Sequence, residues 1–167
     1  MTEKTEVHLD ETGRPVSHAA APIELDYLYN TADKLYAQFA RSCGLSSCAY
    51  WMLYDLERAG GEAPLRRICS TWAYSKQTIS SALKVLEARE LIALSYEEGS
   101  RKNKVVRLTS TGRAFSDESI VPALEAEERA FRSLGEEDGR ELIALVRRYT
   151  RALEEQFAQM GRERDAG

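Results

Sequence analysis

The sequence predicts a mainly α-helical protein that carries one small β-hairpin. Apolar residues recur at the three- and four-residue spacing of helices through most of the chain. Between residues 91 and 109, two short β-like runs flank a turn that contains Gly99. With 167 residues, 43% of them apolar and 30% charged, the chain is long enough to bury the core of one ordinary globular domain.

The first two helices have clear end signals. Apolar positions at helical spacing cover residues 23–43, and Gly44 is placed to end this helix. Ser46 is a suitable N-cap for a second helix, which stops at the pair Gly60-Gly61.

A short helix and a longer one follow. Pro64 opens the short helix, because its missing N–H costs nothing in a first helical turn. Ser75 is a suitable N-cap for the longer helix, which runs to Arg89. One side of this longer helix carries apolar side chains, and the opposite side carries short polar and cationic side chains. We assign to the core the apolar residues Ile68, Trp72, Ile79, Leu83, Leu86, Ile92, Val106 and Leu108.

The hairpin consists of strands at residues 91–96 and 104–109, joined by a turn with basic residues at its tip. Two long helices complete the chain. The first covers residues 111–134 with a kink expected at Pro122, and the second covers residues 138–160.

The charge distribution favours a polyanionic partner for the middle of the chain. Residues 64–108 contain nine Lys or Arg and four Glu, a net charge of +5, although the whole chain carries −4. The flanking segments are therefore acidic. A basic centre of this kind is typical of nucleic-acid-binding proteins.

Other classes of function lack support in the sequence. Only two histidines occur, His8 and His18, both in a polar N-terminal segment, and the cysteines lack the paired spacing of a zinc site. No catalytic motif or glycine-rich phosphate loop is present, so we expect neither an enzyme nor a metal or other cofactor. Without an apolar run of membrane-spanning length or a basic-apolar leader, we expect a soluble, cytoplasmic protein with no membrane partner.

Two stretches make the pattern more specific. Residues 75–92 read SKQTISSALKVLEARELI, and the hairpin closes in the sequence RLTSTGR at residues 107–113. Together they resemble the multiple-antibiotic-resistance regulator (MarR) family, with looser similarity from about Leu25 to Phe157. Three positions depart from the usual family pattern: Ser81 replaces a frequent Arg, Glu90 a frequent Gly, and Ser100 the Asp that usually precedes the wing Arg.

The resemblance implies a winged helix-turn-helix DNA-binding domain at residues 45–110 and a helical dimerisation region formed by residues 23–44 and 111–160. Residues 1–22 are expected to be a polar, flexible tail. The implied function is a homodimeric transcription regulator on a pseudo-palindromic operator, with repression as the family's usual mode. An alternative is a winged-helix module that binds another protein, which an apolar patch on the outer face of the fourth helix would favour.

Double-stranded DNA is the expected main partner. A helix fits the major groove, where Gln77 has an amide able to pair bidentately with adenine, whereas lysines and hydroxyls hold phosphates. A merely solvated helix face would have a similar composition. The expected DNA-binding residues are Ser75, Lys76, Gln77, Thr78, Ser80, Ser81 and Lys84 on the helix, and Arg101, Lys102 and Lys104 on the wing.

Two regulatory inputs follow from the resemblance. A small aromatic or anionic effector would bind between the dimerisation helices and the winged domain, and the residues we place nearest to it are Tyr36, Tyr50, Trp51, Tyr54 and Phe115. A redox-sensing branch of the family uses a reactive thiol. Cys43 and Cys48 are the candidates here, because a helix N-terminus lowers a thiol pKa, although buried inert thiols are more common.

Overall fold

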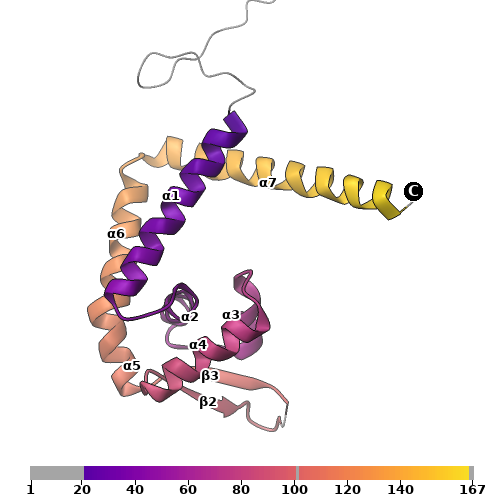
Figure 1. Cartoon of the computed structure of the whole chain (residues 1–167). Helices are drawn as coiled ribbons and strands as arrows, with labels where there is room; N and C mark the ends of the chain where they lie inside the picture. Colours follow the sequence, from indigo (N-terminus) through magenta and orange to yellow (C-terminus); the bar gives the residue numbers. More distant parts are fainter. Residues whose placement is uncertain (1–20, 101, 166–167) are drawn as a thin grey trace, which may run out of the picture. The chain divides into compact units, whose positions relative to one another are not determined.

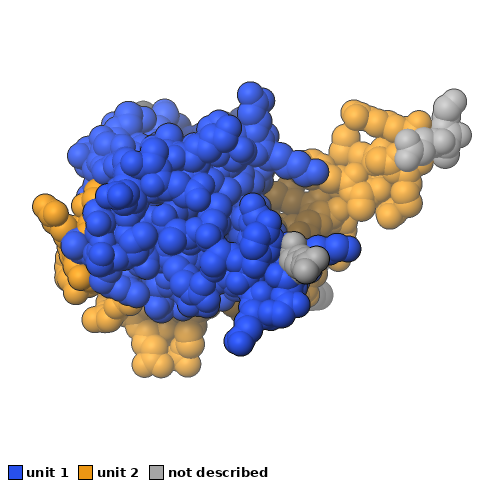
Figure 2. All heavy atoms as spheres, turned by 90° about the horizontal axis from the view of Figure 1, so that it is seen from below, with its two compact units in different colours: residues 1–114 blue, residues 115–167 orange. Residues whose placement is uncertain are grey.

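Helices account for most of the residues that the computed structural model describes, which are 21–100 and 102–165. The chain divides into two units, Met1–Ala114 and Phe115–Gly167 (Figure 2). The predicted fold class, mainly helical with a small β wing, is confirmed. None of the helices in the described ranges combines the length and the apolar character needed to cross a bilayer.

The described part of the first unit contains four helices, a three-stranded sheet and most of a short fifth helix (Figure 1). The two predicted serine caps are confirmed: Ser46 Oγ accepts a hydrogen bond from Ala49 N, and Ser75 Oγ from Thr78 N. The helices are α1 (Ala21–Ser42), α2 (Ser47–Arg58), α3 (Leu65–Thr71) and α4 (Lys76–Ala88), and the strands are β1 (Glu62–Pro64), β2 (Ile92–Tyr96) and β3 (Lys104–Leu108).

The hairpin is the larger part of a sheet that we did not fully predict. Strand β3 is central and pairs antiparallel with β2 on one side and with β1 on the other. Pro64 ends β1 and precedes α3, so the proline that we assigned to the start of a helix also closes a short edge strand. Pro is tolerated there because an edge strand does not need every N–H.

The core of the first unit lies between the helices and the sheet. Leu53 and Leu56 of α2, Leu86 of α4 and Val106 of β3 are almost completely buried, so α2 is the central helix. Of the predicted core residues, Ile68, Leu86, Ile92 and Val106 are buried, whereas Trp72, Ile79, Leu83 and Leu108 are half-buried.

Helix α4 ends in a motif that normally requires glycine. Leu91 N donates to Leu86 O and Glu90 N to Glu87 O, both at 2.9 Å, which is the Schellman pattern. Helix α2 ends in the same way with Gly60 in the left-handed position, at φ 79°. At the end of α4 this position holds Glu90 at φ 55°, and no other non-glycine residue in the described ranges has a positive φ.

Glu90→Gly is therefore expected to stabilise the protein by about 1 kcal/mol, because a side chain in the left-handed region costs roughly that much. The exposed Glu90 side chain makes no hydrogen bond or ion pair among the described residues, so little is lost. Urea unfolding measures the difference. Glu90→Ala is the matched control and should change little, because alanine keeps the backbone strain. Equal stability of the Glu90→Gly and Glu90→Ala variants would contradict the claim that the backbone at Glu90 is strained.

The second unit begins at Phe115, the last residue of the short helix that follows the wing, and its described residues form helical segments. Helix α5 (Ser110–Phe115) leads into a π-helical turn (Ser116–Ile120), followed by α6 (Val121–Arg132) and α7 (Glu136–Asp165). The kink that we expected at Pro122 takes the form of this wider turn, in which Val121 N donates to Ser116 O. Pro122 has no N–H to give to the preceding turn, so the helix changes its hydrogen-bond pattern before the proline.

Candidate nucleic-acid interface

Helix α4 has one face fixed in the core and one free for a partner. Ala82 and Leu86 are buried, whereas the expected DNA-binding residues Lys76, Gln77, Thr78, Ser80, Ser81 and Lys84 are all exposed. Ser75 and Thr78 are also used structurally, because Ser75 Oγ caps the helix and lies 2.8 Å from Thr78 Oγ1. These hydroxyls hold the first turn in place while its polar face remains accessible.

The remaining polar side chains of this face have no partner within the part of the chain that the structure describes. Among the described residues, no hydrogen bond or ion pair is made by the side chains of Lys76, Gln77, Ser80, Ser81 or Lys84. Val85 is also exposed, at 48%, and it is a single apolar side chain next to this polar surface. The face therefore offers free donors and cations and lacks the extended apolar patch expected for a protein partner.

The wing carries its cations beside an ordered turn. Ser100 Oγ accepts hydrogen bonds from Lys102 N at 3.2 Å and from Asn103 N at 2.9 Å, so this serine closes the turn with its own side chain. Gly99 precedes it at φ 74°. The side chains of Lys102 and Lys104 are exposed. The expected minor-groove residue Arg101 lies outside the described residues.

An ion pair ties the wing to the edge strand. The Arg107 guanidinium donates to both carboxylate oxygens of Glu62, at 2.5 and 2.9 Å, and to Ser95 Oγ on β2. These hydrogen bonds lower the pKa of the Glu62 carboxyl. Arg107 thus joins all three strands, whereas the described wing lysines, Lys102 and Lys104, make no ion pair among the described residues.

The RLTSTGR stretch of residues 107–113 forms the joint between the wing and the following helix. Thr109 Oγ1 accepts a hydrogen bond from Gly112 N at 2.9 Å and donates to Glu90 O. Gly112 lies directly against the Leu91 carbonyl, and an added Cβ would be 1.8 Å from that oxygen. Arg113 reaches back to the end of α2, where it is 3.6 Å from Glu57. These residues therefore position the wing rather than contact a partner.

Four of the residues that we expected near an effector lie in one aromatic cluster. The Trp51 ring centroid is 4.6 Å from that of Tyr36, 5.1 Å from Tyr50 and 5.0 Å from Tyr54. Sequence reasoning missed that Trp72 belongs to this cluster: it stacks on Trp51 at 4.2 Å. No periodicity could have indicated this, because the two residues belong to different elements. Trp72 links the cluster to the turn that precedes α4.

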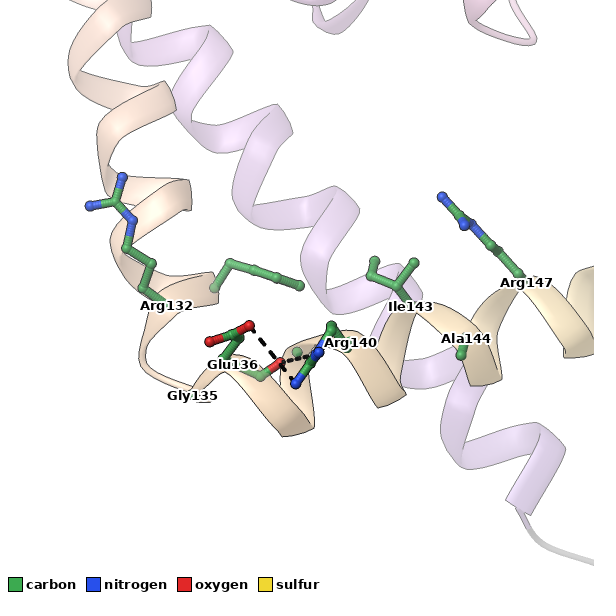
Figure 3. A pocket seen from close by; sticks show the side chains of 9 residues that line it. Arg132, Gly135, Glu136, Arg140, Ile143, Ala144 and Arg147 are labelled. Atoms are coloured by element: carbon green, nitrogen blue, oxygen red, sulfur yellow. Dashed lines mark hydrogen bonds and ion pairs between the residues drawn. The ribbon is translucent and has the colours of Figure 1, made fainter.

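The fifth effector candidate, Phe115, belongs to the second unit. That unit has a groove of about 540 Å³ at the corner between α6 and α7 (Figure 3). Its apolar lining includes Phe131 and Ile143, and its rim includes Arg147. The rim residue Arg140 is already engaged, at 3.8 Å from Glu136.

The three cysteine thiols are either buried or half-buried. Cys48 is buried, and burial raises its pKa, with a smaller contribution from the nearby Cys69. Burial also raises the pKa of the half-buried Cys69. This direction is opposite to that of an activated thiolate. Cys43, the other redox candidate, is half-buried.

These thiols should make the protein less stable in alkali. A raised pKa in the folded state means that the stabilisation is complete below the unfolded pKa, about 8.5, and is lost as pH rises through the folded value. We therefore expect the free energy of unfolding to fall as pH rises above about 8.5. Urea titrations should show a smaller fall for a Cys48→Ala/Cys69→Ala variant. An identical fall in the wild type and in this variant would show that the Cys48 and Cys69 thiols do not cause the loss of stability.

Comparison with known proteins agrees with this geometry. A model of the winged helix DNA-binding domain matches residues 49–112, which span α2 to the joint after the wing. The HTH-type transcriptional repressor NicR of Pseudomonas putida is 28% identical over 151 residues, or 89% of this chain and 94% of NicR.

Solved structures share the fold. A MarR family regulator from Neisseria meningitidis superimposes with a TM-score of 0.69 at 23% identity, over 81% of this chain and 95% of its own. BpsR of Bordetella bronchiseptica, whose DNA binding is regulated by 6-hydroxynicotinic acid, gives a TM-score of 0.56 at 22% identity, over 76% and 98%.

Proposed function

We propose that this chain, a DNA-binding winged-helix transcription regulator of the MarR type, is a repressor that binds a pseudo-palindromic operator as a homodimer and responds to a small aromatic effector. The exposed, unpartnered polar face of α4 is the observation that carries this proposal. In a helix-turn-helix protein, such a face lies in the major groove.

The side chains of α4 divide by chemistry. Gln77 is the one that reads sequence, because its amide can donate to and accept from an adenine edge at the same time. Lys76 and Lys84 neutralise phosphates, and Ser80 and Ser81 donate to phosphate oxygens, which sets the register of the helix on the duplex. Ser75 and Thr78 hold the first turn and add contacts at its N-terminal end.

The wing supplies a second contact with the same duplex. Lys102 and Lys104 are exposed on it, and Arg101 lies between Ser100 and Lys102 in the sequence. We propose that Arg101 and Lys102 enter the minor groove, where the negative potential attracts cations, while Lys104 contacts the backbone. The wing therefore contributes affinity and sensitivity to groove width.

We propose that a second copy of the chain packs against helices α1 and α7. Apolar side chains on α1 and α7 remain exposed, among them Tyr27 at 66%, Leu35 at 63% and Phe157 at 66%. Exposed apolar surface on long helices costs stability in water, and a symmetric dimer removes it on both subunits. Within the second unit, the α6–α7 groove of Figure 3 adds the apolar side chains of Phe131 and Ile143.

The proposed effector is a small aromatic acid or phenol. BpsR responds to an aromatic acid of this class. In this chain the aromatic cluster of Tyr36, Tyr50, Trp51 and Tyr54 contacts Trp72, beside the turn that leads into α4. An effector that rearranged these rings would move the recognition helix. Repression is proposed because NicR, the relative similar over most of this chain, is a repressor.

Selection from a pool of randomised duplexes tests the proposal. The purified chain should enrich an inverted repeat whose half-sites are centred about 10 base pairs apart, the spacing of successive major grooves. Sedimentation of the complex should give two chains per duplex. A variant that lacks Gln77, Gln77→Ala, should enrich a more degenerate sequence. Failure of the wild-type chain to enrich any sequence would overturn the proposal.

A further inference from the structure

The turn between α3 and α4 is attached to α2 by one tryptophan. Trp72 is the residue that follows α3, and its indole Nε1–H donates a hydrogen bond to Asp55 Oδ2 of α2 at 2.9 Å. The same indole stacks on Trp51, with the ring centroids 4.2 Å apart and the planes inclined by 26°. A hydrogen bond is directional, so it fixes the orientation of the indole on α2 more narrowly than stacking does.

We propose that Asp55 is a positioning residue for base recognition. Through Trp72 it fixes the turn that leads into α4, and with that turn the direction in which Gln77 points. This inference rests on the proposed function, because it requires α4 to read DNA. The hydrogen bond between Asp55 and Trp72 does not depend on that function.

The N-terminal end of α4 has no buried side chain. Residues 75–78 are all exposed, and Ile79 is half-buried. The first buried side chain of the helix is that of Ala82, and that of Leu86 follows one turn later. Packing in the core therefore holds the middle and the C-terminal half of α4. The position of its first turn depends on the segment that leads into it.

The connection from Trp72 to this first turn is short. Two residues separate Trp72 from Ser75, the N-cap of α4. Tyr74 N donates to Trp72 O at 2.8 Å, and Ser75 Oγ accepts from Thr78 N at 3.1 Å. A displacement of the Trp72 indole is therefore passed on to Gln77. Because a bidentate contact needs both of its hydrogen bonds in line, a small displacement is enough to lose it.

The Asp55 carboxylate is available for this use alone. Asp55 is half-buried, and within the described ranges its carboxylate makes no ion pair and no hydrogen bond besides that with Trp72. An indole N–H that is removed from water without an acceptor costs free energy. The Trp72 indole is thus favoured in the one place where Asp55 accepts its proton.

Three substitutions in the full chain test the role of this hydrogen bond. Asp55→Leu removes the acceptor, and Trp72→Phe removes the donor but keeps an aromatic ring against Trp51. The affinity for the selected duplex divided by that for a scrambled duplex should fall about tenfold or more in both variants, the discrimination given by one base contact. Asp55→Asn keeps an oxygen acceptor without the charge, and its ratio should stay within about threefold of the wild type.

A double-mutant cycle shows whether Asp55 and Trp72 act through one bond. The combined Asp55→Leu/Trp72→Phe variant should lose no more discrimination than the weaker-binding single variant, because both changes break the same hydrogen bond. Arg89→Ala is the matched control, since Arg89 Nη1 donates to Gly44 O at 2.9 Å and holds the opposite end of α4. This control should keep the wild-type ratio of the two affinities.

Three results of these titrations would overturn the proposal. They are additive losses in the cycle, an equal loss in Arg89→Ala, and wild-type discrimination in Asp55→Leu. Far-UV circular dichroism at the temperature of the titrations establishes that each variant is folded. If Asp55→Leu is unfolded, the comparison of Trp72→Phe with the wild type decides in its place.

Exchange of the indole proton measures the hydrogen bond without DNA. The chain has two tryptophans, so two indole N–H signals are expected in a proton–nitrogen spectrum, and Trp72→Phe identifies the signal of Trp72. This proton should exchange with deuterium slowly in the wild type and in Asp55→Asn. In Asp55→Leu its exchange should be about tenfold faster or more. Equal exchange rates in Asp55→Leu and the wild type would contradict the proposal.

The two measurements separate this inference from the proposed function. If the indole proton is protected but the wild type does not distinguish the two duplexes, the proposed function is wrong, and the inference is wrong with it. If the wild type selects an operator and Asp55→Leu discriminates equally well, only the inference is wrong. The expected result is a protected proton, a selected operator and a loss of discrimination that Asp55→Asn restores.

Discussion

Gly112→Ala is expected to destabilise the first unit by about 3 kcal/mol or more. An alanine Cβ would lie 1.8 Å from the Leu91 carbonyl oxygen and 2.7 Å from its carbon. Both are backbone atoms, so no side-chain rotation relieves the clash. The same carbonyl accepts a hydrogen bond from Thr109 N at 3.2 Å, so moving it breaks the joint between the wing and α5.

Urea unfolding of the purified variants measures this loss. Gly161→Ala is the matched control, because Gly161 is also helical and nothing lies within 4 Å of an added Cβ there. That substitution should raise stability by up to about 1 kcal/mol, the difference in helix propensity. If Gly112→Ala unfolded at the wild-type urea concentration, the close contact with Leu91 would be wrong.

Lys84→Ala and Gln77→Ala are expected to weaken DNA binding in two different ways. Both side chains are exposed on the same face of α4, but Lys84 can only neutralise a phosphate, whereas Gln77 can read a base edge. Loss of Lys84 should weaken binding to every duplex. Loss of Gln77 should remove about 1–3 kcal/mol of base discrimination in each half-site.

Salt titrations separate the two effects. For a dimer, Lys84→Ala should reduce the slope of log K against log salt by about 2, because two phosphate contacts are lost. Gln77→Ala should leave the slope unchanged and lower affinity only for the selected operator. Lys34→Ala, which removes an exposed lysine from α1, is the control and should change neither quantity. Identical behaviour of the Lys84 and Gln77 variants would contradict the assigned roles.

The local signals in the sequence were sufficient for most elements of the fold. Ser46 and Ser75 act as N-caps in the structure, because a serine before an apolar-periodic run satisfies a free N–H at the helix start. Gly60 ends α2 in the left-handed conformation that glycine favours. These signals act within a few residues, and this is why the sequence alone could reveal them.

Features that depend on contacts between distant segments were not predictable. The edge strand β1 exists because Ala63 pairs with Val106 of β3, a partner 43 residues away, and three residues ending in Pro64 have no strand pattern of their own. Likewise, the stacking of Trp51 on Trp72 depends on how α2 and α3 pack. At the interface, the sequence predicted the residue types on α4. Only the structure could reveal which of their side chains have no partner among the residues it describes.

The affinity of the wild-type chain for the selected duplex, compared with a scrambled duplex of the same composition, tests the central claim most directly. Measured at two salt concentrations, the selected duplex should bind about a thousandfold or more tightly, and both affinities should fall as salt rises. Equal affinity for the two duplexes at both salt concentrations would mean that α4 does not read sequence, and it would contradict the assignment of this chain as an operator-binding regulator.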